Sequence, residues 1–244
     1  MKTFKMLFAV LIIAVAGVSC DSEPVDPVVT DQDPNENPGG GNNNGGNNGG
    51  NNAGDGTYWP LAVGNKWIYN ISNGTTTEVT ILGTETLDGQ TWYKFGQENT
   101  GATGNSFLRI SDGDYFLRSS ALTAQGASVT GINYVVLKDD IAVNDTWEDS
   151  FTQSISYGIP GFPDVEYPVE IDGKILEKGI SYMVEGNAYT DVIHSRVWQT
   201  MTGDGFVIIT TTDTWYAKNV GAIKTVTSTS EETITQTLVS YELN

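Results

Sequence analysis

The C-terminal stretch 232-ETITQTLVSYEL-243 decides the fold class of this chain. It is rich in β-branched residues, and from Ile234 to Leu238 successive side chains would point to opposite faces of an extended strand. The pattern repeats every two residues and shows no helical period. The same period recurs in 77-TEVTILGTETL-87, 91-TWYKF-95 and 196-RVWQTM-201. The sequence therefore predicts an all-β protein.

Turn-forming residues separate these strand-like segments at short intervals. They are Asn73-Gly74, Asp88-Gly89, Asp112-Gly113, Asp172-Gly173 and the glycine-rich 203-GDG-205. Such dipeptides supply the positive φ angles that tight hairpins require, so successive strands should be antiparallel neighbours. We therefore expect a strongly curved antiparallel meander sheet that forms a barrel or half-barrel, with a β-sandwich as the alternative.

Two aromatic motifs stand near the two ends of the β-rich region, 58-YWPLAVGNKWIYN-70 and 214-TWYAKNVGAIKT-225. They resemble the opening and closing motifs of a class of uncharacterised envelope lipoproteins that is common in Bacteroidota. The resemblance implies a single β domain over residues 57–244 and a location in the cell envelope. The activity of that class is not established, so the resemblance implies no specific biochemistry.

The first motif also has a direct physical interpretation. Pro60 suits the entry of a strand because it cannot donate to a ladder, and a turn at Gly64-Asn65 would place Trp67 and Tyr69 on one face. Trp215 and Tyr216 precede a Val220-Gly221 turn in the same way. Such aromatic pairs are expected to plug a barrel end or fill the core, with a ligand platform as the alternative.

The N-terminus carries a targeting signal. Met1–Lys5 holds two lysines, and the apolar run from Met6 to Gly17 is shorter than the roughly 20 residues that span a bilayer. Residues 17-GVSC-20 resemble a bacterial lipobox, which implies that residues 1–19 are removed and that Cys20 carries acyl chains such as palmitate. The alternative is an ordinary secretory signal with a chance cysteine.

Residues 20–56 are predicted to form an acylated cysteine followed by a disordered tether. Proline, glycine and asparagine dominate this segment, and it contains too few apolar residues to form a core. Its acidic start, 21-DSEPVD-26, resembles the export signal of surface lipoproteins in Bacteroidota, whereas enterobacterial sorting rules would favour retention at the inner membrane. We expect an outer-membrane lipoprotein at the cell surface, with a periplasm-facing anchor as the alternative.

Charge composition excludes one class of partner. The chain has 30 acidic and 12 basic residues, a formal net charge of −18. This charge repels nucleic acid and anionic head groups, so the predicted membrane contact is through acyl chains alone. The sequence contains no cofactor-binding motif, so no cofactor is predicted.

The sequence predicts no catalytic residues and no metal site. His194 is the only histidine, and Cys20 is the only cysteine. We expect His194 to be structural or exposed, because it is a lone histidine in a strand-like segment, and no serine lies in a nucleophile-elbow motif. Asp112-Gly113-Asp114 is better explained by a hairpin turn than by calcium binding. Three adjacent carboxylate pairs are weak candidates for glycan hydrolysis, because neighbouring strand residues point to opposite faces. These pairs are Asp139-Asp140, Glu148-Asp149 and Glu231-Glu232.

These observations favour a lipid-anchored, non-catalytic envelope module that binds a glycan, a protein or an apolar molecule. Trp92 and Trp198 are the candidate ligand-binding residues. One alternative is a lipid or lipoprotein carrier with a cavity inside a half-barrel. A more remote alternative is a two-carboxylate glycan hydrolase with Trp92 or Trp198 beside its cleft.

Overall fold

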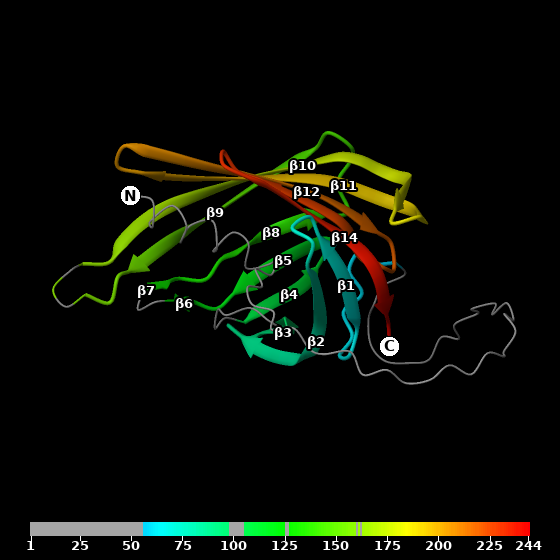
Figure 1. The fold of residues 1–244 in the computed structure, drawn as a ribbon, viewed down its shortest axis with the longest axis horizontal. Helices are drawn as coiled ribbons and strands as arrows, with labels where there is room; N and C mark the ends of the chain where they lie inside the picture. The colour runs from blue at the N-terminus through cyan, green and yellow to red at the C-terminus, as the bar shows by residue number, and fades with distance from the viewer. Residues whose placement is uncertain (1–55, 98–104, 125–126, 160, 162) are drawn as a thin grey trace, which may run out of the picture.

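The computed structural model describes residues 56–97, 105–124, 127–159, 161 and 163–244. Cys20, the signal segment and the tether lie outside the described residues. The described part of the chain contains no helix long and apolar enough to cross a membrane. Its regular structure consists of fourteen strands, and Figure 1 shows how they are arranged. They are β1 (Lys66–Ile71), β2 (Thr76–Leu87), β3 (Gln90–Gln97), β4 (Ser106–Ser111), β5 (Asp114–Ser119), β6 (Leu122–Ala124), β7 (Ala127–Val129), β8 (Asn133–Lys138), β9 (Thr146–Ser156), β10 (Val165–Val184), β11 (Asn187–Gly203), β12 (Phe206–Ala217), β13 (Gly221–Ser228) and β14 (Thr233–Glu242).

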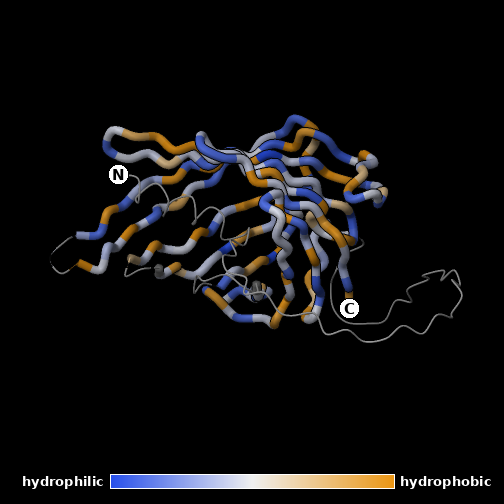
Figure 2. Tube along the Cα trace, viewed as in Figure 1, coloured by the Kyte–Doolittle hydropathy of each residue, from blue (hydrophilic) through white to orange (hydrophobic). Residues whose placement is uncertain are grey.

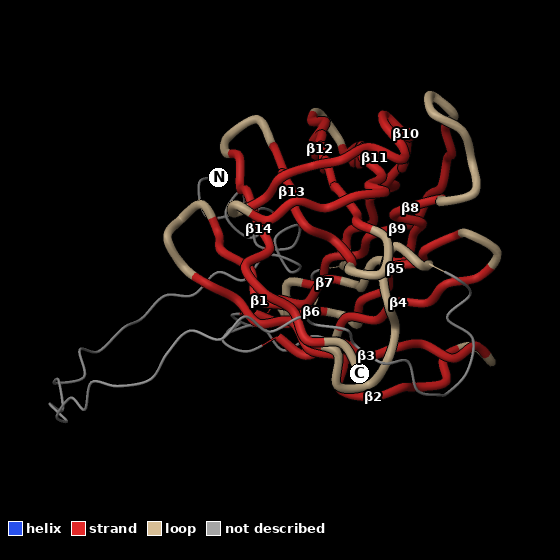
Figure 3. Tube along the Cα trace, turned by 90° about the vertical axis from the view of Figure 1, so that its right-hand side faces the viewer, coloured by secondary structure: helices blue, strands red, loops and turns tan. Residues whose placement is uncertain are grey.

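All fourteen strands belong to one antiparallel sheet. Their order is β6-β7-β9-β10-β11-β12-β13-β14-β1-β2-β3-β4-β5-β8, so most neighbours are consecutive in the chain. The sheet curls strongly: in Figure 3, β10–β13 lie opposite β2–β4, and β14 and β1 join them along one flank. Hydrophobic and hydrophilic residues alternate along the strands, as Figure 2 shows. The predicted curved meander is confirmed, and the sandwich alternative is not adopted.

The edge strand β8 contacts β9, which lies near the opposite edge of the sheet, at a seam built from side chains. Residues 122–138 supply both edges, because β6 and β7 lie beyond β9 while β8 lies beyond β5. At the seam the indole Nε1 of Trp147 donates to the carbonyl oxygen of Val135 at 3.0 Å. The Val135 N–H donates to Asp149 Oδ2, also at 3.0 Å. Two side chains of β9 thus form hydrogen bonds with backbone groups of β8 that would otherwise need a neighbouring strand.

One predicted turn is wrong. Asp172-Gly173 lies in the middle of β10, and Gly173 pairs directly with Trp147 of β9. A Cβ atom at Gly173 would lie only 1.9 Å from the indole Cε2 of Trp147. Glycine is therefore required at position 173 because the Trp147 ring packs directly against it. Gly173 does not adopt a positive φ angle, so it does not serve a turn.

The other predicted hairpin turns are confirmed. Asp88-Gly89 joins β2 to β3 and Asp112-Gly113 joins β4 to β5, and all four residues have positive φ angles. Gly74, with φ 90°, lies between β1 and β2, and residues 203–205 connect β11 to β12. A hairpin that the sequence analysis did not identify, at Glu185-Gly186, joins the two longest strands.

The two aromatic motifs pack against each other inside the curled sheet. Trp67 is fully buried, and its Nε1 donates to the carbonyl oxygen of Val220 at 2.6 Å. The Tyr69 hydroxyl donates to the carbonyl oxygen of Ala222 at 3.0 Å. Burial raises the pKa of Tyr69, which therefore stays neutral. The predicted role of Trp67 and Tyr69 in the core is confirmed.

The turn in the first motif also connects the two ends of the domain. Gly64 has a φ of 91°, as the predicted Gly64-Asn65 turn requires. The buried Asn65 side chain donates to the carbonyl oxygen of Pro60 at 3.0 Å and accepts from the Asn244 N–H at 2.8 Å. One amide therefore holds the entry segment and the C-terminus together.

Candidate functional site

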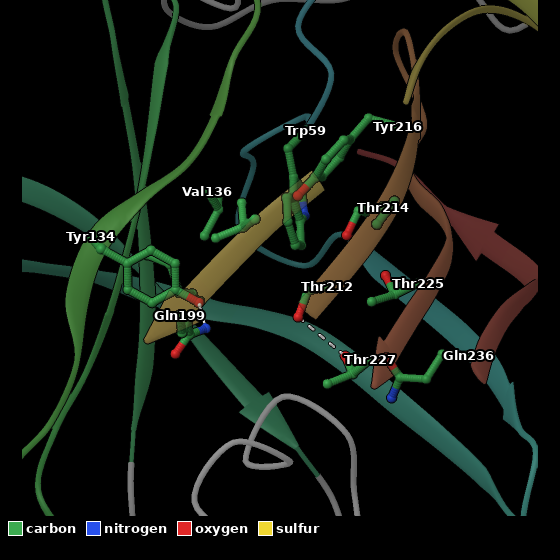
Figure 4. A pocket seen from close by; sticks show the side chains of 13 residues that line it. Trp59, Tyr134, Val136, Gln199, Thr212, Thr214, Tyr216, Thr225, Thr227 and Gln236 are labelled. Carbon is green, nitrogen blue, oxygen red and sulfur yellow. Dashed lines mark hydrogen bonds between the residues drawn. The ribbon is translucent and has the colours of Figure 1, made fainter. Parts of the chain in front are cut away.

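A cavity of about 90 Å³ lies inside the curl (Figure 4). One wall comes from β11 to β14, the facing wall comes from β5 and β8, and Trp59 enters from the segment before β1. Its lining residues are Trp59, Leu117, Tyr134, Val136, Val197, Gln199, Thr212, Thr214, Tyr216, Ala222, Thr225, Thr227 and Gln236.

A second space of about 60 Å³ lies next to the first and shares Trp59, Leu117, Ala222, Thr225 and Gln236 with it. Pockets for drug-sized ligands usually enclose about 300–1,000 Å³, so each compartment is much smaller. Taken together they compare with the cavity of about 150 Å³ that admits benzene in an engineered protein. These two spaces of the described residues therefore offer room for a small molecule.

Threonine hydroxyls form the polar wall of the cavity. Thr214 pairs with Thr225 and Thr212 with Thr227 across β12 and β13. Because side chains alternate along a strand, every second residue of these strands faces inward. The Oγ1 atoms of Thr212 and Thr227 lie 3.4 Å apart. A hydroxyl can donate or accept, so this wall can adapt to either kind of polar group.

The opposite wall presents an amide and a phenol. Gln199 Nε2 donates to the Tyr134 hydroxyl at 2.8 Å. Burial raises the pKa of Tyr134, while the hydrogen bond from Gln199 opposes that rise. Burial also raises the pKa of Tyr216. Both phenols are therefore neutral at physiological pH, and none of the described lining residues carries a charge.

Trp59 is the lining residue with an unmet bonding requirement. Its indole Nε1 is buried and has no hydrogen-bond partner. The ring packs against Phe95 at 5.9 Å and Tyr216 at 5.8 Å between centroids, which fixes its orientation. Figure 4 shows the ring nitrogen on the side of the cavity that carries Thr214. A buried unsatisfied donor costs about 1–3 kcal/mol, so an acceptor placed in the cavity would recover that energy.

The structure does not bring Trp92 and Trp198 together. Trp92 lies on β3 and Trp198 on β11, and five strands separate these two in the sheet. Neither residue lines the two cavities. Trp92 is buried beneath Arg109 and Arg118, and Trp198 is half-buried beside Arg196.

His194 belongs to an outward-facing cluster of paired groups. Its Nδ1 lies 3.0 Å from Glu177 Oε2, and its Nε2 lies 2.9 Å from Asp213 Oδ1. A neutral imidazole has one N–H, so only the imidazolium can donate to both carboxylates at once. Arg196 also binds Asp213 through two bonds of 2.9 Å, and the His194 ring stacks on Trp215 at 3.9 Å. Each of these contacts cross-links neighbouring strands, which fits a structural role.

Three of the carboxylates considered for catalysis or metal binding have structural partners: Asp114, Asp139 and Asp149. Asp139 accepts from the Tyr115 hydroxyl at 2.7 Å, and Asp149 caps the β8 edge at Val135. Asp114 binds Lys138 at 2.7 Å, beside the β4–β5 turn. Across the described ranges, no three histidine, cysteine or acidic side chains gather in a geometry that could hold a metal ion.

No protein-family model and no curated protein sequence matches the chain. Among solved structures, it is similar to a candidate lipoprotein from Parabacteroides distasonis. That similarity has a TM-score of 0.50 and 13% sequence identity, and covers 76% of this chain and 98% of the other. A candidate exported protein with a YmcC-like fold from Bacteroides fragilis aligns with a TM-score of 0.48 and 11% identity, over 77% of this chain and all of the other. The chain thus shares its curled β-sheet fold with the Parabacteroides protein.

Proposed function

We propose that this chain is a lipid-anchored protein of the bacterial cell envelope whose non-catalytic β domain binds a small uncharged molecule beside Trp59. The lipobox-like segment supplies the anchor at Cys20. The shared fold with a candidate lipoprotein supports an envelope role. Acyl chains contribute about 0.8 kcal/mol for each buried methylene, so two or three chains on one cysteine anchor a protein stably.

The observation that carries the binding proposal is the unpartnered indole N–H of Trp59 inside a preformed cavity. Ligand sites usually combine an apolar lining with a few well-placed polar groups. Here Trp59 and Tyr216 supply flat apolar surface, and Thr214 supplies a hydroxyl close to the indole nitrogen. A ligand oxygen could accept from the indole and exchange a second bond with the threonine wall.

The lining also restricts the class of ligand. Its polar groups are hydroxyls and amides, and its phenols are neutral because burial raises their pKa. An ionic ligand would lose its hydration without meeting an opposite charge, which is strongly unfavourable. The proposed ligand is therefore a small neutral molecule with oxygen acceptors, or the uncharged end of a larger one, such as a terminal neutral sugar.

The two alternative functions receive less support. Among the described residues, the spaces of about 90 Å³ and 60 Å³ are smaller than the usual pocket for a drug-sized ligand, so they do not favour an acyl-chain carrier. A two-carboxylate hydrolase needs acids that flank a cleft, whereas Asp139 and Asp149 hold the tyrosine and seam contacts described above.

Calorimetry and thermal melting test the binding proposal. The full-length chain, purified in detergent, is titrated with galactose, N-acetylglucosamine and small amides. We expect one class to bind and to raise the melting temperature, since a ligand at 100 times its Kd adds about 2.7 kcal/mol of stability. Trp59→Phe keeps the packed ring but removes the N–H, and should weaken binding about tenfold. Trp198→Phe is the matched control and should bind normally. Binding that is equal in Trp59→Phe, or no binding across the panel, contradicts the proposal.

A further inference from the structure

The first part of β12 has a free backbone edge. β12 pairs with β11 along its whole length, from Phe206 to Ala217, but with β13 only from Thr211 onward. Residues 206–210 therefore have a neighbouring strand on one side. Among the described residues, no backbone hydrogen bond joins their other side to a neighbour. In Figure 1 the hairpin between β11 and β12 extends beyond the turn between β13 and β14. We call residues 206–210 the β12 edge.

The β12 edge also exposes two large apolar side chains. Val207 is 60% exposed and Ile209 is 53% exposed. Side chains alternate along a strand, and Thr210 is buried while Ile208 packs against the core, so Val207 and Ile209 point to the outer face. A strand that combines unpaired backbone groups with exposed apolar side chains is a template for another strand.

A free edge on β2 shows how such a segment is protected elsewhere in this chain. Residues 83–87 pair with β3, and among the described residues they have no partner strand on the side of β1. This segment carries the exposed Glu85 and follows a register shift at Ile81. Charges and bulges of this kind prevent pairing with another chain. The β12 edge has neither protection, because residues 206–212 hold no charge and pair with β11 without a register shift.

We propose that the β12 edge pairs with the same edge of a second copy of this chain, in antiparallel order about a two-fold axis at Ile208. In that register Val207 lies opposite Ile209 of the partner subunit, and the reverse contact occurs by symmetry. Each copy supplies the backbone donors and acceptors that the other lacks, so one sheet continues through both copies. The exposed apolar side chains of the two edges then cover each other.

The local distribution of charge fits a second copy in this register. The net charge of −18 opposes general contact between two copies, so they can meet closely only where carboxylates are not opposed. Continued past the paired segment, the register aligns Asp204 with Thr212 of the partner subunit and Asp213 with Gly203 of the partner subunit. Asp213 is also paired with Arg196. A foreign strand would find no charged group on the β12 edge to recognise, whereas the edge is complementary to itself.

A membrane anchor would strengthen this short interface. Interfaces that bury less than about 1,200 Å² are usually weak and transient. Two copies that are tethered to one membrane meet at a raised effective concentration, and this strengthening alone rests on the lipid anchor proposed above. Strand pairing does not involve the cavity beside Trp59, because the residues of β12 that line it begin at Thr212.

Cysteine cross-linking tests the register directly. Val207→Cys and Ile209→Cys are produced in the same cells as two differently tagged full-length chains and are oxidised with copper phenanthroline. Residues directly opposite each other in an antiparallel pair have Cα atoms about 4.5–5.5 Å apart, which a disulfide can bridge. Two copies of one variant are diagonal neighbours about 7–8 Å apart, which a disulfide does not bridge easily. The wild-type chain, whose single cysteine is Cys20, gives the background.

Sedimentation of the full-length chain in detergent, over a range of protein concentrations, measures the strength of the dimer. Val207→Lys places a charge on the edge and should raise the dissociation constant about tenfold. Leu82→Lys is the matched control, because Leu82 is also 60% exposed but lies on β2. Added salt should strengthen the dimer, since it screens the repulsion between two acidic copies. Melting curves verify that each variant is folded.

We expect the mixed pair of cysteine variants to cross-link about fivefold more than either variant with itself. The proposal is overturned if the mixed pair gives no product, if like and mixed pairs cross-link equally, or if Leu82→Lys weakens the dimer as much as Val207→Lys. A dimer that weakens as salt is added would also contradict it. Cross-linking of Val207→Cys to a different protein, without a product between two copies, would assign the edge to a foreign strand and overturn the proposal.

Discussion

The indole nitrogen of Trp67 and the carbonyl oxygen of Val220 lie 2.6 Å apart, although 153 positions separate the two residues in the chain. Trp67 belongs to the first aromatic motif and Val220 to the second. Trp67 lies on β1 and Val220 lies in the turn just before β13, and β14 separates β1 from β13 in the sheet. This buried bond therefore spans a strand and locks the start of the domain to its end.

Replacing Trp67 by phenylalanine should destabilise the protein by about 1–3 kcal/mol, because the buried bond to Val220 is lost. Urea unfolding followed by circular dichroism measures the change. Trp198→Phe, at a half-buried outward site, should stay within about 0.5 kcal/mol of the wild type. Equal stability of the Trp67 variant and the wild type would show that the bond does not hold the motifs together.

Gly173→Ala should destabilise by about 1–3 kcal/mol, because the new methyl group overlaps the Trp147 indole and strains the seam. Gly83→Ala is the matched control: Gly83 also lies within a strand, but a Cβ there meets no atom within 4 Å. Adding Trp147→Ala to Gly173→Ala should produce a non-additive change, since the overlap is then gone. If both glycine variants melt alike, the close packing at the seam is not needed.

Alkaline pH should unfold the protein through its buried tyrosines. Burial raises the pKa of Tyr69, Tyr134 and Tyr216 above the unfolded value of about 10. The stability that these groups contribute is fully present below pH 10 and is lost as the pH rises above it. Absorbance at 295 nm should show exposed tyrosines ionising first and the buried ones only as the native circular dichroism disappears. Ionisation of all eleven tyrosines near pH 10 in a folded protein would contradict this expectation.

Cys20→Ser should abolish acylation and release the chain from the membrane while the β domain still folds. The physical reason is that the anchor depends on acyl chains at one sulfur, whereas the described core begins after residue 56. Labelling cells with a clickable fatty acid and fractionating the membranes measures the first effect, and thermal melting measures the second. Retained label in the mutant would rule out the lipobox interpretation.

Much of the fold could be predicted because local chemistry and global structure agree. The positive φ angles at Asp88-Gly89 and Asp112-Gly113 are properties of the residues themselves, so their turns were identified correctly. Gly173 was misassigned because its role depends on Trp147, a residue 26 positions earlier that meets it only in the folded sheet. An Asp-Gly dipeptide alone does not indicate whether its glycine forms a turn or makes room for an aromatic ring on a neighbouring strand.

The candidate sites were harder to predict for a related reason. An inward threonine such as Thr214 is indistinguishable in sequence from an outward one until the neighbouring strands are known. Trp59 lies within the first motif, beside Pro60, but the sequence does not indicate that its ring turns into the curled sheet. Trp92 is a predicted ligand-binding residue, but its contact with Arg109 cannot be predicted from the sequence. That contact depends on how β3, β4 and β5 pair.

The central claim, that the cavity beside Trp59 is a binding site, is tested most directly by the indole resonances of the ¹⁵N-labelled protein. The chain has six tryptophans, and the Trp59 signal is assigned as the one missing in Trp59→Phe. We predict that a neutral ligand which binds by calorimetry shifts the Trp59 indole N–H signal, because its buried donor gains an acceptor, and leaves the Trp198 signal in place. A Trp59 signal that stays unmoved at saturating ligand would contradict the account.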